Sequence, residues 1–161
     1  CIICPNHRSN FDPPLVACFI KRRVYYMAKQ ELFENKFIAV ILKGLGAFPI
    51  KRGASDITAI KNSMKLLKDG KMLGIFPEGK RSKDNTLGEA EPGVAMLAIK
   101  MKVPVVPIAI MGNYKLFSRI TIKIGNPCNL EQYAKSKNTN DDYKRISQNI
   151  LLDIKALMEE N

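Results

Sequence analysis

The sequence of 161 residues has no tryptophan, a single histidine and only four cysteines. Its longest apolar runs, residues 13–20 and 103–111, fall well short of the ~18 residues that a membrane-spanning helix needs, so no transmembrane helix is predicted. The few scattered cysteines predict no disulfide framework, and a reducing compartment is expected. The chain also lacks an initiating methionine and a charged-then-apolar leader, so we expect an upstream segment, signal or anchor to be missing from it.

The composition and the length predict one folded domain. Apolar residues make up 46% of the chain and charged residues 25%, which is typical of globular proteins. A length of 161 residues corresponds to a single domain, here spanning residues 1–161. The net charge of +11 favours anionic partners such as phosphates, acidic lipid headgroups, nucleic acid or an acidic protein, and does not choose among them.

The hydrophobic pattern alternates between the periods of helices and strands. This alternation predicts an α/β fold, with a central, mostly parallel sheet and helices on both faces. The predicted helices are residues 13–20, 36–42, 55–69, 93–101 and a long one from residue 141. The predicted strands are residues 1–4, 24–28, 47–50, 71–76, 103–110 and 120–124.

The only histidine follows the first predicted strand. His7 at such a position can act as a general base near neutral pH, and Asp12, five residues later, can hold its Nδ1–H and leave Nε2 free to accept a proton. The alternative is that His7 is a solvated loop residue and that Asp12 caps the next helix, with Pro13 at its first position.

A zinc site is not expected at this strand. Cys1-x-x-Cys4 followed by His7 has the start of one, but tetrahedral zinc needs four ligands. The other two cysteines are single and the chain has no second histidine, so buried structural cysteines are the better interpretation.

Two further strand ends carry basic loops. Residues 76–82 contain Glu78, which suits an arginine or a substrate hydroxyl, and the cations Lys80 and Arg81; an arginine can bind a phosphate through two parallel hydrogen bonds. Residues 46–53 place Arg52 just before a predicted helix start, where phosphates bind readily. The simpler interpretation of each loop is a solvated basic turn. Ligands of α/β folds bind outside the carboxyl ends of strands, which favours a functional role.

Four blocks of this sequence resemble the ordered motifs of the glycerolipid acyltransferases. They are Asn-His-x4-Asp at residues 6–12, Gly-x-Phe-x-Ile-x-Arg at 46–52, Phe-Pro-Glu-Gly-x-Arg-Ser at 76–82 and Val-Pro-Val-Val-Pro-Ile-Ala at 103–109. The order and separation of the blocks make the resemblance specific, and together they span about two thirds of the chain.

The resemblance implies transfer of a fatty acyl group from a thioester to the free hydroxyl of 1-acyl-glycerol-3-phosphate, which gives phosphatidate. His7 would be the general base and Asp12 its partner. The donor would be acyl-CoA or acyl-acyl-carrier-protein, and no metal or other cofactor is implied. A thioester is already activated, so direct attack by the hydroxyl needs no covalent enzyme intermediate.

The same resemblance assigns an acceptor site for lysophosphatidate or a related lysolipid. Lys80 stands where the family usually has threonine, and its charge bears on acceptor preference. The residues implied at the acceptor phosphate are Arg52, Arg81 and Lys80, and those that shape the acceptor site are Glu78, Gly79 and Ser9.

Three alternatives stay open at this stage. The first is an acyltransferase for another glycerol-phosphate or lysophospholipid acceptor. The second is a serine hydrolase or thioesterase built on Ser9, although the G-x-S-x-G pattern is absent. The third is a basic, non-catalytic binding module; no nucleic-acid motif is present, and no nucleic-acid partner is expected.

Lipid substrates place the predicted enzyme at a membrane surface. We expect it at the cytoplasmic face of the membrane, peripheral or anchored through a segment missing from this chain. The cations at residues 21–23, 51–52 and 80–81 provide an electrostatic approach to an anionic membrane surface, which high salt would weaken.

Overall fold

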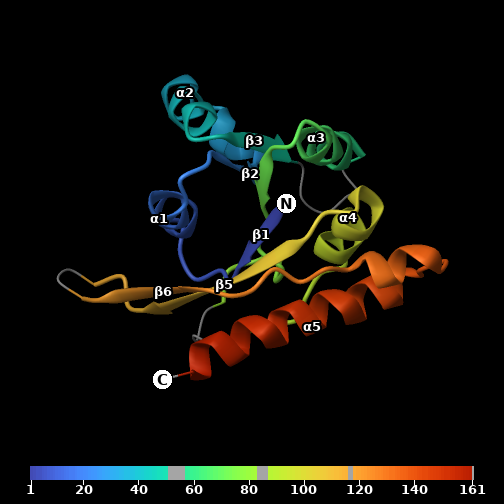
Figure 1. The fold of residues 1–161 in the computed structure, drawn as a ribbon. Helices are drawn as coiled ribbons and strands as arrows, with labels where there is room; N and C mark the ends of the chain where they lie inside the picture. Colours follow the sequence, from blue (N-terminus) through green and yellow to red (C-terminus); the bar gives the residue numbers. More distant parts are fainter. Residues whose placement is uncertain (51–56, 83–86, 116–117, 161) are drawn as a thin grey trace.

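A computed structural model describes residues 1–50, 57–82, 87–115 and 118–160. One six-stranded sheet runs through the molecule in the order β3-β2-β4-β1-β5-β6 (Figure 1). Every neighbouring pair is parallel except β5 and β6. The predicted mostly parallel sheet is therefore confirmed. The strands are β1 (Ile2–Pro5), β2 (Val24–Lys29), β3 (Ala47–Ile50), β4 (Met72–Gly74), β5 (Val105–Gly112) and β6 (Ile120–Ile124).

Helices cover both faces of this sheet, as the sequence predicted. In Figure 1, α1 and α2 lie on one side of it, and α3, α4 and α5 lie on the other. Two short 3-10 helices, η1 (Gln30–Phe33) and η2 (Glu131–Lys135), were not predicted. The α-helices are α1 (Asp12–Phe19), α2 (Lys36–Gly44), α3 (Ile57–Lys68), α4 (Gly93–Met101) and α5 (Asn140–Glu159).

The two faces of the sheet bury two separate clusters of apolar side chains. Alternate residues of β1 point to opposite faces, so Ile2 joins the larger cluster, with α3, α4 and α5, while Ile3 joins the smaller one, with Val16 of α1. The central strand is therefore apolar on both sides, as expected for a covered parallel strand.

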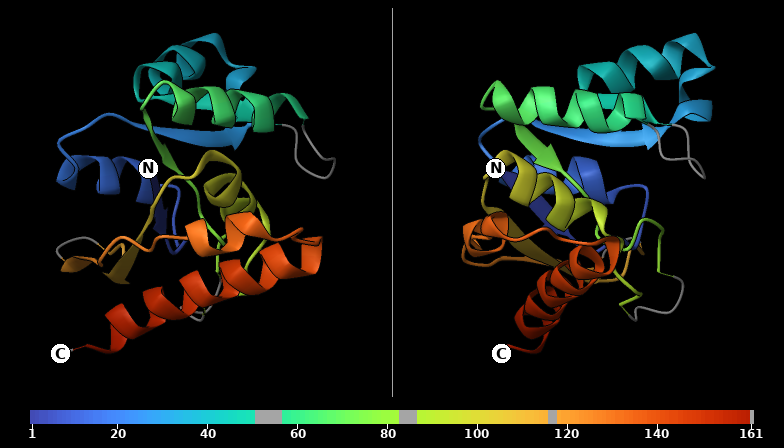
Figure 2. Two further views of the ribbon diagram at one scale, coloured as in Figure 1. Left: turned by 45° about the vertical axis from the view of Figure 1, so that its right-hand side comes forward. Right: turned by 90° about the vertical axis from the view of Figure 1, so that its right-hand side faces the viewer.

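The last helix packs along the sheet as its spacing predicted. Ile146, Ile150 and Ile154 recur at intervals of four and are buried against the larger cluster. Thr139 and Asp142 form a capping box, which explains why the helix begins at Asn140. Figure 2 shows α5 running beside α4 and η2. None of the helices within the described ranges is long and apolar enough to cross a membrane.

The topology singles out the carboxyl ends of β1 and β4. These strands are neighbours, but β1 leads into α1 on one face, whereas β4 leads into α4 on the other. Ligands of open α/β sheets bind where adjacent strands diverge in this way. Residues 6–11 and 75–82 both lie at this point.

Candidate active site

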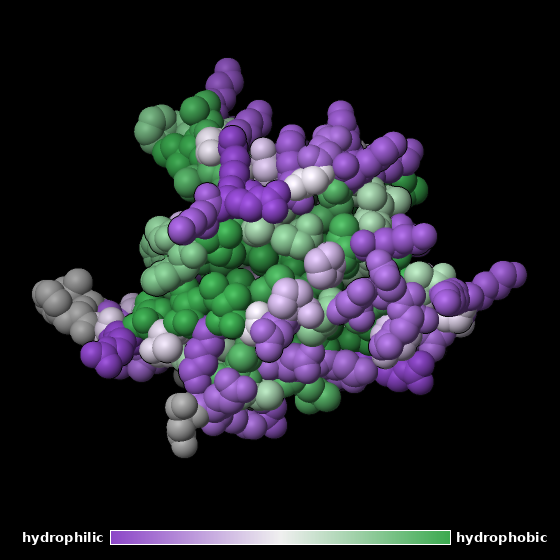
Figure 3. Space-filling view, in the orientation of Figure 1, coloured by the Kyte–Doolittle hydropathy of each residue, from purple (hydrophilic) through white to green (hydrophobic). Residues whose placement is uncertain are grey.

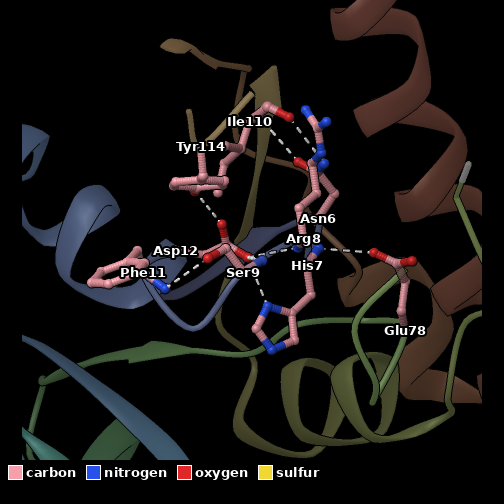
Figure 4. A network of polar contacts seen from close by, with 9 residues as sticks. All are labelled: Asn6, His7, Arg8, Ser9, Phe11, Asp12, Glu78, Ile110 and Tyr114. Atoms are coloured by element: carbon pink, nitrogen blue, oxygen red, sulfur yellow. Dashed lines mark hydrogen bonds and ion pairs between the residues drawn. The ribbon is translucent and has the colours of Figure 1, made fainter. Parts of the chain in front are cut away.

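His7 and Asp12 form a hydrogen-bonded pair in the loop after β1. The distance from Nδ1 of His7 to Oδ2 of Asp12 is 2.7 Å, and the carboxylate is fully buried. An ionised carboxylate only accepts hydrogen bonds, so Nδ1 is the protonated nitrogen of the neutral ring. Nε2 then carries a free lone pair, and Figure 4 shows it directed away from Asp12.

Asp12 is held in its charged form by the surrounding loop. Its Oδ2 accepts the backbone N–H groups of Arg8 at 2.6 Å and Ser9 at 2.7 Å, and its Oδ1 accepts the hydroxyl of Tyr114. Burial alone raises the pKa of Asp12, but the hydrogen bonds from His7, Ser9, Tyr114 and Arg8 together bring that pKa below its usual value.

The capping interpretation of Asp12 is wrong in this structure. The helix α1 begins at Asp12 itself, Phe11 occupies the N-cap position, and no side chain caps the helix. The carboxylate points back to the preceding loop, where three of its hydrogen-bond donors lie (Figure 4).

Aromatic stacking fixes the plane of the His7 ring. The ring of Phe76 stacks on it at a centroid distance of 4.0 Å and an interplanar angle of 22°, and Tyr26 stacks on Phe76 at 5.9 Å. Gly74 makes room for this stack, because a Cβ at that position would lie 2.1 Å from the Tyr26 ring. The hydrogen bond to Asp12 and the stacking on Phe76 together restrain the orientation of the imidazole ring.

Glu78 joins the loop after β4 to the loop after β1. It is buried, and its Oε1 accepts the backbone N–H of His7 at 2.9 Å while its Oε2 accepts that of Gly88 at 3.0 Å. In return, Ser82 donates its N–H to the carbonyl of His7 at 2.9 Å. Both oxygens of Glu78 are thus engaged with backbone, which favours a positioning role over contact with the acceptor; shaping of the acceptor site stays a prediction.

The predicted phosphate-binding cations lie in the same loop or outside the described residues. Lys80 and Arg81 are exposed and lie between Glu78 and Ser82, both of which contact His7. Gly79 has φ +63°, a conformation that favours glycine and turns the loop at this point. Arg52 lies outside the described residues.

Ser9 does not pair with the histidine. Its N–H donates to Asp12, its Oγ accepts the N–H of Phe11 at 3.2 Å, and no hydrogen bond joins it to the ring of His7. Ser9 thus stabilises the loop that holds Asp12, and a direct role in the acceptor site stays a prediction.

The cysteines next to this loop do not form a metal site with it. Burial raises the pKa of the Cys4 thiol, so the residue stays protonated. Within residues 1–50, 57–82, 87–115 and 118–160 no group of three or more His, Cys, Asp or Glu residues is placed to hold a metal ion.

Two contacts of the site were not predicted from the sequence, although Asn6 stands in the Asn-His-x4-Asp motif. Tyr114 lies beyond the end of β5, 102 residues from Asp12. Asn6 is buried, and its side-chain amide donates to the carbonyl of Ile110 at 3.1 Å and accepts its N–H at 2.7 Å, which ties the end of β1 to β5. Only the pairing of β1 with β5 brings these residues together.

A buried carboxylate that orients a histidine, at the diverging carboxyl ends of a mostly parallel sheet, gives this α/β fold an arrangement that can carry general-base chemistry. The sequence matches the Acyltransferase family over residues 1–111. This match covers more than half of the chain, which therefore belongs to that family.

Individual relatives are similar over most of the chain. The 1-acyl-sn-glycerol-3-phosphate acyltransferase of Bacillus subtilis (strain 168) is 38% identical over 70% of this chain and 58% of its own length. The enzyme of the same name from Streptococcus pneumoniae (strain ATCC BAA-255 / R6) is 30% identical over 99% of this chain and 61% of its own length. The chain thus spans less than two thirds of either relative.

A solved structure has the same fold. The crystal structure of the 1-acyl-sn-glycerophosphate (LPA) acyltransferase from Thermotoga maritima matches with a TM-score of 0.74 and 24% identity, over 99% of this chain and 67% of that one. This solved structure therefore confirms the predicted α/β architecture.

Proposed function

We propose that this chain transfers a fatty acyl group from a thioester to the free hydroxyl of 1-acyl-glycerol-3-phosphate, giving phosphatidate. The observation that carries the proposal is the His7–Asp12 pair, whose Nε2 is left free at the diverging strand ends. The names of the relatives from Bacillus subtilis and Streptococcus pneumoniae support the choice of acceptor.

The chemistry needs only one proton carrier. Nε2 of His7 takes the proton of the acceptor hydroxyl while its oxygen attacks the thioester carbonyl carbon, so a C–O bond forms. The tetrahedral intermediate then expels the sulfur, the C–S bond breaks, and the thiolate takes the proton back from His7. Asp12 stays ionised and stabilises the charged imidazole in between, because its pKa is low.

The remaining partners follow from this reaction. The donor is acyl-CoA or acyl-acyl-carrier-protein, and the acceptor phosphate binds Arg81 and Lys80 beside the catalytic loop, with Arg52 as a third cation. Since the acceptor and product are membrane lipids, the chain acts at an anionic membrane surface on the cytoplasmic side, peripheral or anchored elsewhere.

The direct test removes the base and its partner separately. His7→Ala and Asp12→Ala should each lower the rate of acyl transfer by at least about a hundredfold, because general-base catalysis contributes ~10²–10⁴. Circular dichroism and thermal unfolding of each variant provide the control for folding. Near-normal turnover by a folded His7→Ala variant would contradict the proposal, and release of free fatty acid without acceptor would indicate a thioesterase instead.

A further inference from the structure

The exposed apolar side chains of this protein are unevenly distributed. Most of the large ones in the described residues belong to the stretch 11–45, on α1, η1 and α2 and beside them. We call this surface the α1–α2 face. Its exposed apolar members are Phe11, Phe19, Leu32, Phe37, Ile38, Val40, Ile41 and Leu45.

The helix α2 contributes most of this face. Of its residues only Ala39 is buried, whereas Phe37 is 75% exposed and Val40 71% exposed. The helix nevertheless has a capped N-terminus, because the side chain of Asn35 accepts the N–H groups of Phe37 and Ile38. Helix formation at α2 therefore depends on its cap and on contacts with β3 and η1, while most of its large apolar side chains stay in solvent. Exposed apolar patches of this kind mark interaction surfaces.

Exposed cations outnumber exposed acids in the stretch that carries this face. Lys36 and Lys43 stand at the two ends of α2, and Arg23 donates to the carbonyls of Lys43 and Gly44 at 2.9 Å each, so its charge is held at the end of the helix. The exposed cations of residues 19–45 are Lys21, Arg22, Arg23, Lys29, Lys36 and Lys43, of which Arg22 is bonded to the carbonyl of Gly70 after α3 on the other side of the sheet, and the exposed acids are Glu31 and Glu34. Figure 3 shows hydrophobic surface on this side of the molecule, crossed and bordered by hydrophilic residues.

The face also reaches the catalytic loop. Phe11 is 67% exposed, lies at the start of α1 and packs its ring near that of Tyr114 at 6.4 Å. Its N–H is bonded to Ser9, whose own N–H holds Asp12. Phe11 therefore places an exposed apolar side chain of this face directly beside the loop that holds Asp12.

We propose that the α1–α2 face is the surface through which this protein rests on a bilayer that contains anionic lipid. Phe37 and Val40 enter the acyl region, and the surrounding cations contact the headgroups. The inference rests on the proposed function for its choice of occupant, because a lipid acceptor must enter the site from a bilayer. Charge alone would make attachment fully reversible by salt, whereas an inserted apolar face leaves a salt-resistant component.

The absence of tryptophan from the sequence permits a direct test. Phe37→Trp introduces a single reporter on the face, and Leu152→Trp introduces a matched one on α5, across the sheet, at a position that is 53% exposed. With vesicles of phosphatidylcholine and phosphatidylglycerol, the emission of Trp at position 37 should shift to the blue and be quenched by brominated acyl chains. The emission at position 152 should not change.

A second pair of variants measures the contribution of the face to binding. Phe37→Glu combined with Val40→Glu should lower the partition coefficient on these vesicles by at least about tenfold, since two exposed apolar side chains that would enter the bilayer are replaced by charges. Leu152→Glu, the control, should change it less than about twofold. Part of the binding of the unaltered protein should survive high salt.

Three outcomes would overturn the inference. They are an unshifted reporter at position 37, equal binding by the two Glu variants, or a reporter that is already shielded without lipid in a concentration-dependent dimer, which would assign the face to a second copy.

Vesicle binding is measured without turnover, so it is independent of the proposed reaction. A protein that inserts position 37 but transfers no acyl group would refute only the function. Full turnover on a water-soluble short-chain acceptor by the double Glu variant, with loss on vesicle-embedded acceptor, would support both.

Discussion

At the scale of single residues, the site is centred on Asp12 rather than on the histidine. The carboxylate accepts hydrogen bonds from the ring of His7, the backbone of Arg8 and Ser9, and the hydroxyl of Tyr114. Burial and the bond to Asp12 raise the pKa of Tyr114, so its phenol remains a donor at neutral pH. Tyr114 therefore supplies the hydrogen bond to Oδ1 of Asp12, while His7, Arg8 and Ser9 donate to Oδ2.

Tyr114→Phe should move the acidic limb of the pH–rate profile to higher pH. Without the phenol the carboxylate is more basic, so the His7–Asp12 pair holds its proton more tightly, by up to about one pH unit for a hydrogen bond of ~1.5 kcal/mol. The groups that face the pair are Arg8, Glu78 and Tyr114, of which only Tyr114 is altered.

The profile of kcat/KM between about pH 5 and 9 measures this effect. Tyr133→Phe, on η2 away from the site, is the matched control and should leave the limb in place. A limb unmoved by Tyr114→Phe would show that the phenol only supports the loop.

The cations near the site should contribute to binding of the phosphorylated acceptor and not of the thioester donor. Arg81→Ala and Arg52→Ala should each raise KM for the phosphorylated acceptor by at least about tenfold, because a charge-assisted hydrogen bond contributes ~1.5–3 kcal/mol. KM for the thioester donor should change less than about twofold. Arg145→Ala, an exposed arginine on α5, is the control. Equal effects on the two substrates would indicate structural arginines.

At the scale of elements, the site depends on how the ends of β1, β4 and β5 are tied together. Asn6 joins β1 to β5 through the backbone carbonyl and N–H of Ile110. Glu78 joins the loop after β4 to the backbone of His7. Both ties run from a buried side chain to the backbone. Each would leave unsatisfied backbone groups if removed, so each stabilises one arrangement of the three strand ends.

Glu78→Gln tests whether this carboxylate positions the loop or binds the acceptor. The amide retains one acceptor oxygen but loses the other, so the backbone N–H of either His7 or Gly88 loses its partner. We expect kcat to fall by about tenfold, with little change in KM for the acceptor, since misplacement of the base affects the chemical step.

Steady-state kinetics with the acceptor varied separate the two roles. Glu89→Gln is the matched control, because Glu89 is exposed and paired with Lys144 at the surface. A rise in KM for the acceptor at unchanged kcat would instead place Glu78 in contact with that substrate.

At the scale of the whole molecule, the lowered pKa of Asp12 couples the site to folding. The folded pKa lies below that of the unfolded chain, which is ~3.9, so the charged form stabilises the fold above that pH. This stabilisation is lost as the pH falls through the folded value. The net charge of +11 adds repulsion that grows as other carboxylates protonate.

Urea unfolding from pH 7 to pH 3 should therefore show a free energy of unfolding that falls in the acid range. Asp12→Asn should be less stable at pH 7 by about 1–3 kcal/mol, because a charged acceptor of buried donors is lost, and should show a shallower decline below about pH 4. Asp153→Asn, on α5, is the control. Parallel curves for Asp12→Asn and the unaltered protein would refute the linkage.

The sequence by itself determined the features that depend on near neighbours in the chain. The hydrophobic periodicity predicted the strands of the sheet and the helices that cover it. The spacing of five residues between His7 and Asp12 predicted their contact, because a short loop can bring the two side chains together. The long helix from residue 141 was equally predictable, since its apolar residues recur at helical spacing.

Only the tertiary structure decided the rest. Glu78 reaches the backbone of His7 across 71 residues, Tyr114 reaches Asp12 across 102, and Asn6 reaches Ile110 across 104. The apolar pattern of residues 36–42 predicted a helix, but not that its apolar side would be left uncovered. The physical reason is the same in each case: strand order and register are set by packing over the whole sheet, and they alone decide which distant groups meet and which apolar face remains in solvent.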